Sequence, residues 1–486
     1  MKRRARFYSL IIISLLSCTS PLKGNSLLKR TITRQVDPII VKGEDLSKFL
    51  GKKVNSLYLY ANRGQTSVET TRRVVSTDPV GSDPEKFVPI PFQIDRRDSQ
   101  GDLIFPSSSV NPVRNQRFLN GVNSKSQISN SKNLNFGKDS NSYSLLSNND
   151  ELVFMAKDLG NRVLQKDWIK DREEGLEIEV IDPLNGSKGW AYLFSFSSPK
   201  KKSSLDYVDY LPKENKIKAQ RYIVGFCPQA EMVFDNLTIT KTGGGDGVDI
   251  FDRFKVRVEA RMFLGVRFSK NEEDFTSQVT GYLDGPVRVI RRSKSRTKVF
   301  GVFSTPWANS DFTAYCSFFK LPIIINLPFD LSLLLSKLSL RMSADASLIT
   351  GRKFYNSNNL KGVELDGVMS KKEHKLDYGP AKWLVVAGTR EGDTGTWLNR
   401  LLIPPSSGLI PNLYYQDDLE ALDGPEEVPG QIGNIGYEIT NFTHLKGGKY
   451  KIISIMYTLP KYKVGDEKGY LDVLDHPLKV VVKEGL

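Results

Sequence analysis

The stretch KVRVEARMFLGVRF, residues 255–268, carries the strongest fold signal in the chain. Apolar residues occupy every second position, namely Val256, Val258, Ala260, Met262, Leu264, Val266 and Phe268. The positions between them include Lys255, Arg257, Glu259, Arg261 and Arg267. A period of two is typical of a β-strand with one buried face. The stretch therefore predicts one long, half-buried strand over 255–268.

The same signal recurs along the chain, between clusters of Gly, Pro, Asn and Asp. Strand patterns cover residues 177–181, 190–196, 287–292, 338–346, 383–387, 450–458 and 478–482. Helix patterns are few. Residues 330–338 could form a short helix, although the alternation from Leu338 to Ala346 favours a strand. The pattern predicts a mainly β protein of two antiparallel β-sandwich domains with few short helices.

Length and composition indicate more than one folded domain. The chain has 486 residues, whereas single domains typically run to about 100–200. Hydrophobic residues make up 39% and charged residues 26%, which excludes a wholly disordered or collagen-like chain. We expect an N-terminal β-sandwich over 38–200 and a larger β-sandwich over 218–486. The basic, polar stretch 199–218 is the expected boundary.

Residues 107–149 interrupt the first of these domains. They include 11 Ser and 10 Asn among 43 residues. Such a segment cannot bury enough apolar surface to offset the entropy lost on ordering. We therefore expect a long exposed insertion.

The first 17 residues have the pattern of an export signal. Four cationic side chains precede an apolar run that is too short to span a bilayer. The sequence LLSC at 15–18 follows, and it resembles the lipobox of bacterial lipoproteins, in which the cysteine is acylated. The alternative is a secretory signal in which Cys18 is incidental.

The lipobox implies a cellular location for the protein. We expect a signal peptide over 1–17, lipidation at Cys18 and a tether over 18–37 that anchors the chain to a membrane. The expected location is the cell envelope, at the outer membrane of a Gram-negative-type bacterium. Removing 1–17 lowers the formal net charge from +14 to +10. This charge favours anionic glycans or lipids as partners, and no nucleic acid is expected in an exported protein.

Three further segments resemble parts of uncharacterised exported bacterial β-proteins. They are PIPFQIDRRDSQGDL at 89–103, DELVFMAKDLG at 150–160 and DGPVRVIRR at 284–292. In that group the large second domain resembles the β-supersandwich of mutarotase-like and polysaccharide-lyase proteins. The resemblance implies a supersandwich-like second domain, and it brings no catalytic residue with it.

Several classes of catalytic site lack their sequence patterns. The three histidines show no Cys-x-x-Cys or His-Glu-x-x-His arrangement, and neither a Gly-x-Ser-x-Gly elbow nor a phosphate-binding Walker loop is present. The sequence therefore gives no support for a zinc site, a nucleophile-elbow hydrolase or a phosphate-binding nucleotide site. Cys227 and Cys316 allow at most one disulfide, and the alternative is that both are small buried apolar residues.

Two groups of acidic residues have the composition of a calcium site. They are Asp95, Asp98 and Asp102 around Gly101, and Asp417, Asp418 and Glu420 near Asp423. Calcium takes several oxygen ligands, which a sharp turn can supply. Neither group follows the EF-hand spacing, and the alternative is a loop held by Asx turns. Tyr414 and Tyr415 precede the second group, which makes Tyr415 a candidate sugar contact.

A run of cations falls on alternate positions, at Arg292, Lys294, Arg296 and Lys298. On an extended strand all four side chains share one side. This basic stripe could bind an anionic glycan or a lipid head group. The alternative is a solvated face or a charged edge strand.

We expect a structural or binding module of the cell envelope, for glycans or other envelope components, with no certain cofactor and calcium as a candidate. The alternative is a polysaccharide lyase or glycoside hydrolase. A hydrolase needs two carboxylates across the sugar, and Glu364, Asp366 and His374 are candidates to complement Asp417 and Asp418. Trp383 and Trp397 could stack on sugar rings, with core packing as the alternative for Trp383.

Overall fold

The computed structural model describes residues 28–64, 87–106, 145–228, 230–299, 303–327, 329–389, 391–425 and 428–484. Cys18, the signal segment 1–17 and most of the Ser/Asn-rich insertion lie outside these ranges. The described chain is mainly β and built of antiparallel sheets, which confirms the predicted fold class. Its one α-helix, α1 (Glu467–Asp475), is too short to cross a membrane, and no other described segment forms a membrane-spanning helix.

The N-terminal lobe consists of two sheets packed on one apolar core. The three-stranded sheet has the order β1 (Pro38–Lys42), β5 (Glu151–Met155), β4 (Phe92–Asp95). The five-stranded sheet has the order β27 (Lys479–Lys483), β6 (Glu174–Ile181), β7 (Lys188–Ser195), β2 (Leu57–Asn62), β3 (Phe87–Pro89). The lobe is therefore a sandwich, as expected.

The second lobe, which we call the sandwich lobe, contains the remaining three sheets. A four-stranded sheet has the order β11 (Phe234–Ile239), β10 (Tyr222–Phe226), β9 (Lys216–Ala219), β8 (Val208–Leu211). A five-stranded sheet has the order β13 (Arg267–Lys270), β12 (Phe251–Met262), β19 (Leu335–Ala346), β25 (Gln431–Ile439), β24 (Pro411–Asp418).

The largest sheet of the sandwich lobe has ten strands. Its order is β14 (Phe275–Asp284), β15 (Arg288–Val299), β17 (Ala308–Tyr315), β18 (Phe318–Leu327), β26 (Gly448–Leu459), β23 (Thr396–Leu402), β22 (Leu384–Ala387), β20 (Lys353–Asn356), β21 (Val363–Glu364), with β16 (Phe303–Ser304) on β15. Short 3₁₀ turns connect the strands, among them η11 (Leu331–Leu333), η12 (Glu373–Lys375) and η14 (Phe442–His444).

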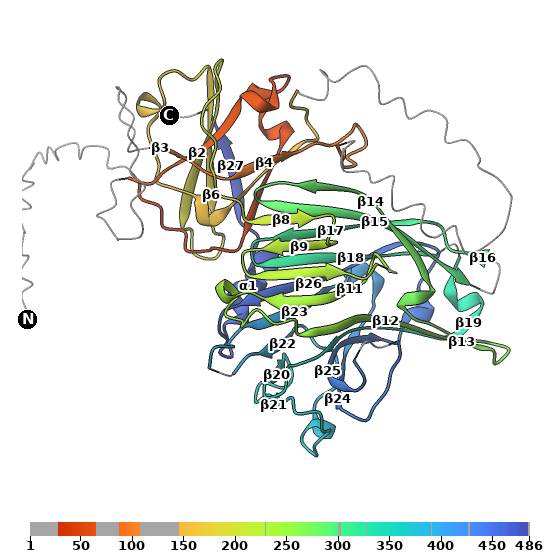
Figure 1. The fold of residues 1–486 in the computed structure, drawn as a ribbon. Coiled ribbons are helices and arrows are strands. Elements are labelled where there is room, and N and C mark those ends of the chain that lie inside the picture. The colour runs from red at the N-terminus through yellow and green to blue at the C-terminus, as the bar shows by residue number, and fades with distance from the viewer. Residues whose placement is uncertain are drawn as a thin grey trace, which may run out of the picture.

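The central strands of the ten-stranded sheet are buried on both faces. One face packs on the five-stranded sheet of the sandwich lobe through the largest core cluster, which includes Phe319, Trp397 and Met342. The other face meets Val153 and Met155 of the N-terminal lobe. The strands of this sheet therefore hold the two lobes against each other (Figure 1).

The chain returns to the N-terminal lobe at its end, which corrects the expected domain bounds. β27 pairs with β6 from Lys479↔Ile181 to Lys483↔Glu177. Figure 1 shows β27, in blue, among the orange and yellow strands of the first lobe. The expected second domain 218–486 is therefore not one sheet system. It also begins too late, because β8 and β9 already belong to the sandwich lobe.

The stretch 255–268 is a hairpin rather than one long strand. β12 ends at Met262, and Gly265 adopts φ +83°, a left-handed conformation that suits a tight turn. β13 then pairs back on β12, with Arg267 opposite Arg261. The predicted alternation of burial holds from Val258 to Met262, whereas Lys255 is fully buried and the turn leaves Leu264 91% exposed.

Two smaller expectations were also wrong. Residues 330–338 form no α-helix, because η11 is a single 3₁₀ turn before β19 begins at Leu335. The described end of the expected tether, 28–37, is packed on the lobe instead of extending from it. Ile32 is buried, and the Arg30 guanidinium donates to the carbonyls of Lys157 and Leu159 at 2.9 Å each.

A buried ion network joins the two lobes at Arg288. Its guanidinium donates to Asp95 Oδ2 at 2.7 Å, to Glu151 Oε2 at 2.6 Å and to the Tyr315 hydroxyl at 3.1 Å. Gln93 Oε1 accepts from the backbone N–H groups of residues 287 and 288. Burial disfavours the Glu151 carboxylate, but Arg288 and Arg97 outweigh it and hold its pKa below the usual range. The segments 89–103, 150–160 and 284–292 therefore meet at this interface.

Arg288→Met should lower the free energy of unfolding by about 3–5 kcal/mol, because it leaves two carboxylates without their buried partner. Urea denaturation measures the change. The control is Arg63→Met, since the Arg63 side chain is 45% exposed and lies 3.6 Å from Asp158. Its removal should cost less than about 1 kcal/mol. Equal losses in the two variants would contradict the assigned role of Arg288.

Candidate functional site

An apolar cavity of about 230 Å³ lies between the two large sheets of the sandwich lobe. The five-stranded sheet contributes Val256 and Val258 of β12 and Leu338 and Leu340 of β19. The ten-stranded sheet contributes residues of β15, β17 and β18, among them Ser295, Ala308, Ser310, Leu321, Ile323, Ile325 and Leu327. The apolar face predicted for 255–268 therefore forms one wall of the cavity.

Small side chains account for the empty volume. On β15 and β17 the inward positions hold Ser295, Ala308 and Ser310, and Ser295 is paired with Ala308. Protein cores are close-packed when large and small side chains interdigitate across facing positions. Small residues on the β15 and β17 wall leave this end of the sandwich unfilled.

The cavity opens to solvent at one end. Ile323, Ile325 and Leu327 alternate along β18 on the inward face, yet all three are only half-buried. Val258 on the facing strand is half-buried as well. Apolar side chains that face another sheet would normally be fully buried, so their residual exposure marks an accessible cavity. Among the described residues that line the cavity, Arg296 is the only charged one.

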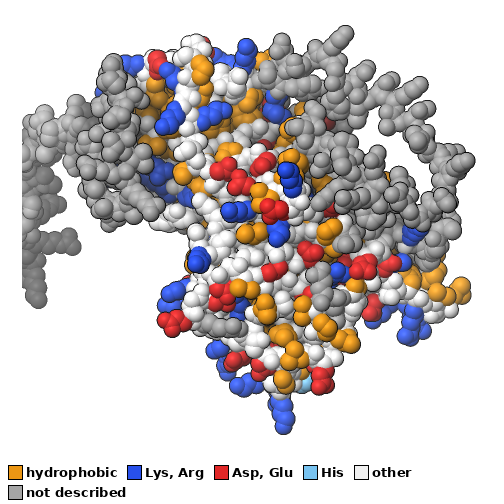
Figure 2. Space-filling model, viewed as in Figure 1, with side chains coloured by type: hydrophobic (Ala, Val, Ile, Leu, Met, Phe, Trp, Pro, Cys, Tyr) orange, Lys and Arg blue, Asp and Glu red, His pale blue; other side chains and the backbone are white. Residues whose placement is uncertain are grey.

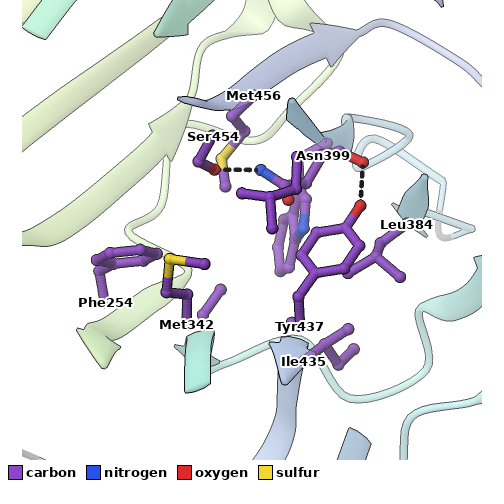
Figure 3. Close-up of a pocket in the computed structure, with 12 residues that line it drawn as sticks. Phe254, Met342, Leu384, Asn399, Ile435, Tyr437, Ser454 and Met456 are labelled. Atoms are coloured by element: carbon purple, nitrogen blue, oxygen red, sulfur yellow. Dashed lines mark hydrogen bonds between the residues drawn. The ribbon is translucent and has the colours of Figure 1, made fainter. Parts of the chain in front are cut away.

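A second, enclosed cavity lies deeper in the same core and holds about 20 Å³ (Figure 3). The Asn399 side chain points across it to Ser454 Oγ at 2.9 Å, and the Tyr437 hydroxyl donates to the Asn399 carbonyl at 3.2 Å. This volume suits about one water molecule. Phe254 lines both cavities and separates the small one from the large one.

The basic stripe lies on β15, at the positions that alternate with Ser293, Ser295 and Thr297. Arg292 is engaged by Asp311, which accepts two hydrogen bonds at 2.6 and 2.8 Å. Lys294 and Arg296 lie over the Trp307 ring, at 4.9 and 4.5 Å from its centre. Lys298 is exposed. The stripe therefore offers Lys294, Arg296 and Lys298, but not Arg292, to a ligand.

Asp417 and Asp418 hold nearby loops in place by accepting hydrogen bonds from backbone N–H groups. Asp417 is fully buried and accepts hydrogen bonds from the backbone N–H groups of Asp366, Gly367 and Gly433. Burial raises the pKa of the Asp417 carboxyl to about 6, and the backbone hydrogen bonds from Asp366 and Gly367 oppose that shift. Asp418 Oδ1 accepts from the backbone of Glu420 in an Asx turn.

Neither proposed calcium group converges on one point. Asp423 pairs with Arg341, Asp95 pairs with Arg288, and Asp98 accepts from the backbone N–H groups of residues 100 and 102. No set of three or more metal-ligating side chains comes together in the described ranges. The calcium expectation is corrected for the described residues, because the carboxylates do not converge and most of them, namely Asp95, Asp98, Asp417, Asp418 and Asp423, already accept from backbone donors or cations.

The residues expected to serve a sugar site are buried or dispersed. Tyr415 is buried, and its hydroxyl donates to Glu373. Glu364, Asp366 and His374 are exposed, and Asp366 Oδ1 accepts from the backbone of Val368. Trp383 and Trp397 are both buried in the core.

The two body cysteines are buried in different core clusters. Cys227 lies in the largest cluster of the sandwich lobe, and Cys316 lies in the cluster at the lobe interface. No disulfide joins them. They contribute to the cores as small residues.

Sequence reasoning missed the cavity. Its inward small residues lie between the cations of the stripe, since Ser293, Ser295 and Thr297 alternate with Lys294 and Arg296. The predicted basic stripe rests only on the charged positions of this alternation. A run of hydroxyl residues where a sandwich strand should bury apolar side chains was the signal for incomplete packing.

Comparisons with known proteins add a distant likeness. No family model matches the chain, and no curated sequence matches it. An α-mannosidase from Enterococcus faecalis V583 aligns at 11% identity and TM-score 0.37, over 64% of this chain and 39% of that one. A glycosyl hydrolase family 38 protein from Enterococcus faecalis aligns at 10% and 0.35, over 63% and 42%. The aligned part spans about two fifths of those chains, and at these scores they assign neither substrate nor activity.

Asp417→Asn should lower the free energy of unfolding by about 1–3 kcal/mol, because an amide N–H₂ would face backbone donors inside the core. Thermal unfolding should show the same loss with calcium and with a chelator. Asp418→Asn is the matched control, since an Asn oxygen can still accept from residue 420. A loss that appears only when calcium is present would restore the metal site.

Proposed function

We propose that this protein is a binding module of the cell envelope that holds an amphiphile, with the acyl chain in the large cavity and an anionic head group at its rim. The observation that supports this is the open cavity of about 230 Å³ between β12, β19 and β18. Glycans are a weaker candidate, because the aromatic residues expected to stack on sugars are buried.

The cavity has the size and lining that suit a hydrocarbon. An apolar cavity of about 150 Å³ stays dry and binds benzene, so this larger one can take part of an acyl chain. Transfer of apolar surface out of water stabilises the complex by about 25 cal/mol per Å². The half-exposed side chains of Ile323, Ile325 and Leu327 provide such surface.

The rim offers a cation for the head group. Arg296 lines the cavity and is exposed, and Lys294 lies beside it over the same Trp307 ring. A guanidinium forms charge-assisted hydrogen bonds with carboxylate or phosphate oxygens. The rim therefore favours an acidic amphiphile over a neutral one.

The cellular location of the protein is part of the proposal and rests on the sequence alone. Residues 1–17 would direct export, and acylation of Cys18 would anchor the chain in the envelope, at an outer membrane. An anchored protein is well placed to meet membrane amphiphiles. Mass spectrometry of the mature N-terminus tests the anchor, and an unmodified N-terminus at another residue would contradict it.

Cis-parinaric acid, a fluorescent fatty acid, should bind to the purified protein with a rise in emission. Ile325→Trp should lower the affinity at least about tenfold, because the larger side chain occupies the cavity. Ile410→Trp is the matched control, because Ile410 is 46% exposed and lies outside the lining. The proposal is wrong if the parent chain does not bind the probe, or if Ile325→Trp binds it unchanged.

The head-group assignment has its own test. Arg296→Gln should weaken binding of the fatty acid but leave binding of its methyl ester unchanged, because only the acid carries a negative charge. An equal loss for acid and ester would show that Arg296 contributes packing and not charge.

A further inference from the structure

The tip of the β12–β13 hairpin exposes a group of large apolar side chains. Phe263 is 64% exposed, Leu264 91% and Val266 56%. Soluble proteins expose single apolar residues routinely, but a contiguous group at a loop tip indicates a contact surface.

A second exposed apolar segment lies directly beside this tip. Leu333 is 67% exposed and Leu334 37%, and Phe263 N–H donates to the Leu334 carbonyl at 3.3 Å. The two segments therefore form one protruding end of the sandwich lobe. Figure 1 shows the hairpin end at the right, and Figure 2 shows hydrophobic side chains with Lys and Arg beside them at that edge.

Three cations lie in one row behind the tip. Arg261 of β12 is paired with Arg267 of β13 on one side and with Lys337 of β19 on the other. All three are exposed, and none has an ion pair with another described residue. Like charges at directly opposite positions repel each other, so the row costs stability unless an anionic surface meets it.

We propose that this tip surface, formed by Phe263, Leu264, Val266, Leu333 and Leu334 with the cation row Arg261, Arg267 and Lys337, docks on a bilayer that carries anionic head groups. The apolar side chains enter the boundary between head groups and acyl chains, and the cation row contacts the anionic head groups just above it. Binding to another protein would not require the apolar side chains and the cations to lie in two separate layers.

The tip surface adjoins the cavity. Leu331, the first residue of η11, lines the cavity, and Leu333 ends the same turn at the tip. Docking would place the mouth of the cavity near the acyl chains of the bilayer. The docking proposal does not require the cavity to bind a ligand, so Ile325→Trp should dock like the parent chain.

An environment-sensitive NBD fluorophore attached through Leu264→Cys tests insertion. The full chain should show a blue shift and a rise in emission with vesicles of phosphatidylcholine and phosphatidylglycerol, and a smaller change with phosphatidylcholine alone. The matched control is Leu348→Cys, because Leu348 is 66% exposed and follows the opposite end of β19. The parent chain treated with the same reagent gives the background from its own cysteines.

Charge removal tests the cation row. Arg261→Gln with Arg267→Gln and Lys337→Gln should raise the half-saturating concentration of the anionic vesicles roughly tenfold or more, and high salt should have a similar effect on the parent chain. Lys361→Gln with Lys371→Gln and Lys372→Gln, three exposed cations elsewhere, should leave it unchanged. Equal effects of the two triple variants would contradict the role of the row.

Two outcomes would overturn the proposal itself. One is a probe at position 264 that remains in water at saturating vesicle concentrations, or that responds no more strongly than the probe at the control site. The other is an emission change that follows protein concentration without any vesicles, which would identify the tip as a contact between copies of the chain. Loss of fatty-acid binding with normal docking would instead count against the amphiphile proposal alone.

Discussion

A guanidinium group removed from water needs hydrogen-bond acceptors around it, and Arg288 finds them on both lobes. Asp95 and Glu151 belong to the N-terminal lobe, whereas Tyr315 belongs to the ten-stranded sheet. Because a buried charge without partners costs several kcal/mol, this network permits one arrangement of the lobes. It fixes one face of the ten-stranded sheet against the first lobe and leaves the other face to pack on β12 and β19. The apolar cavity forms on that second face.

The core of the sandwich lobe is filled unevenly. Near β22 and β23, large residues such as Trp397 and Tyr437 are fully buried and leave space for about one water. Towards the hairpin end, small residues such as Ser295, Ala308 and Ser310 occupy inward positions, and the gap widens to about 230 Å³. Unfilled apolar volume costs stability, so its retention next to an exposed apolar tip is consistent with a binding role.

The sequence predicted the strands well and the site poorly. Alternation located the strands because one buried face imposes a period of two, but it does not encode where a strand reverses, so the turn at Gly265 was missed. The return of β27 to β6 depends on long-range pairing that no local pattern records. The acidic clusters suggested calcium sites, yet Asp417 accepts hydrogen bonds from backbone N–H groups of segments that are distant in the sequence. The cavity arises from small residues whose facing partners are known only in the fold.

A crystal structure with a fatty acid brominated at its terminal carbon tests the amphiphile proposal most directly, because anomalous scattering locates the bromine independently of the refined chain. We predict a bromine peak between β12 and β18, in contact with Val258 and Ile323, with the carboxylate at Arg296. A peak confined to the exposed tip at Leu264, or no peak within the sandwich lobe at saturating ligand, would contradict the account.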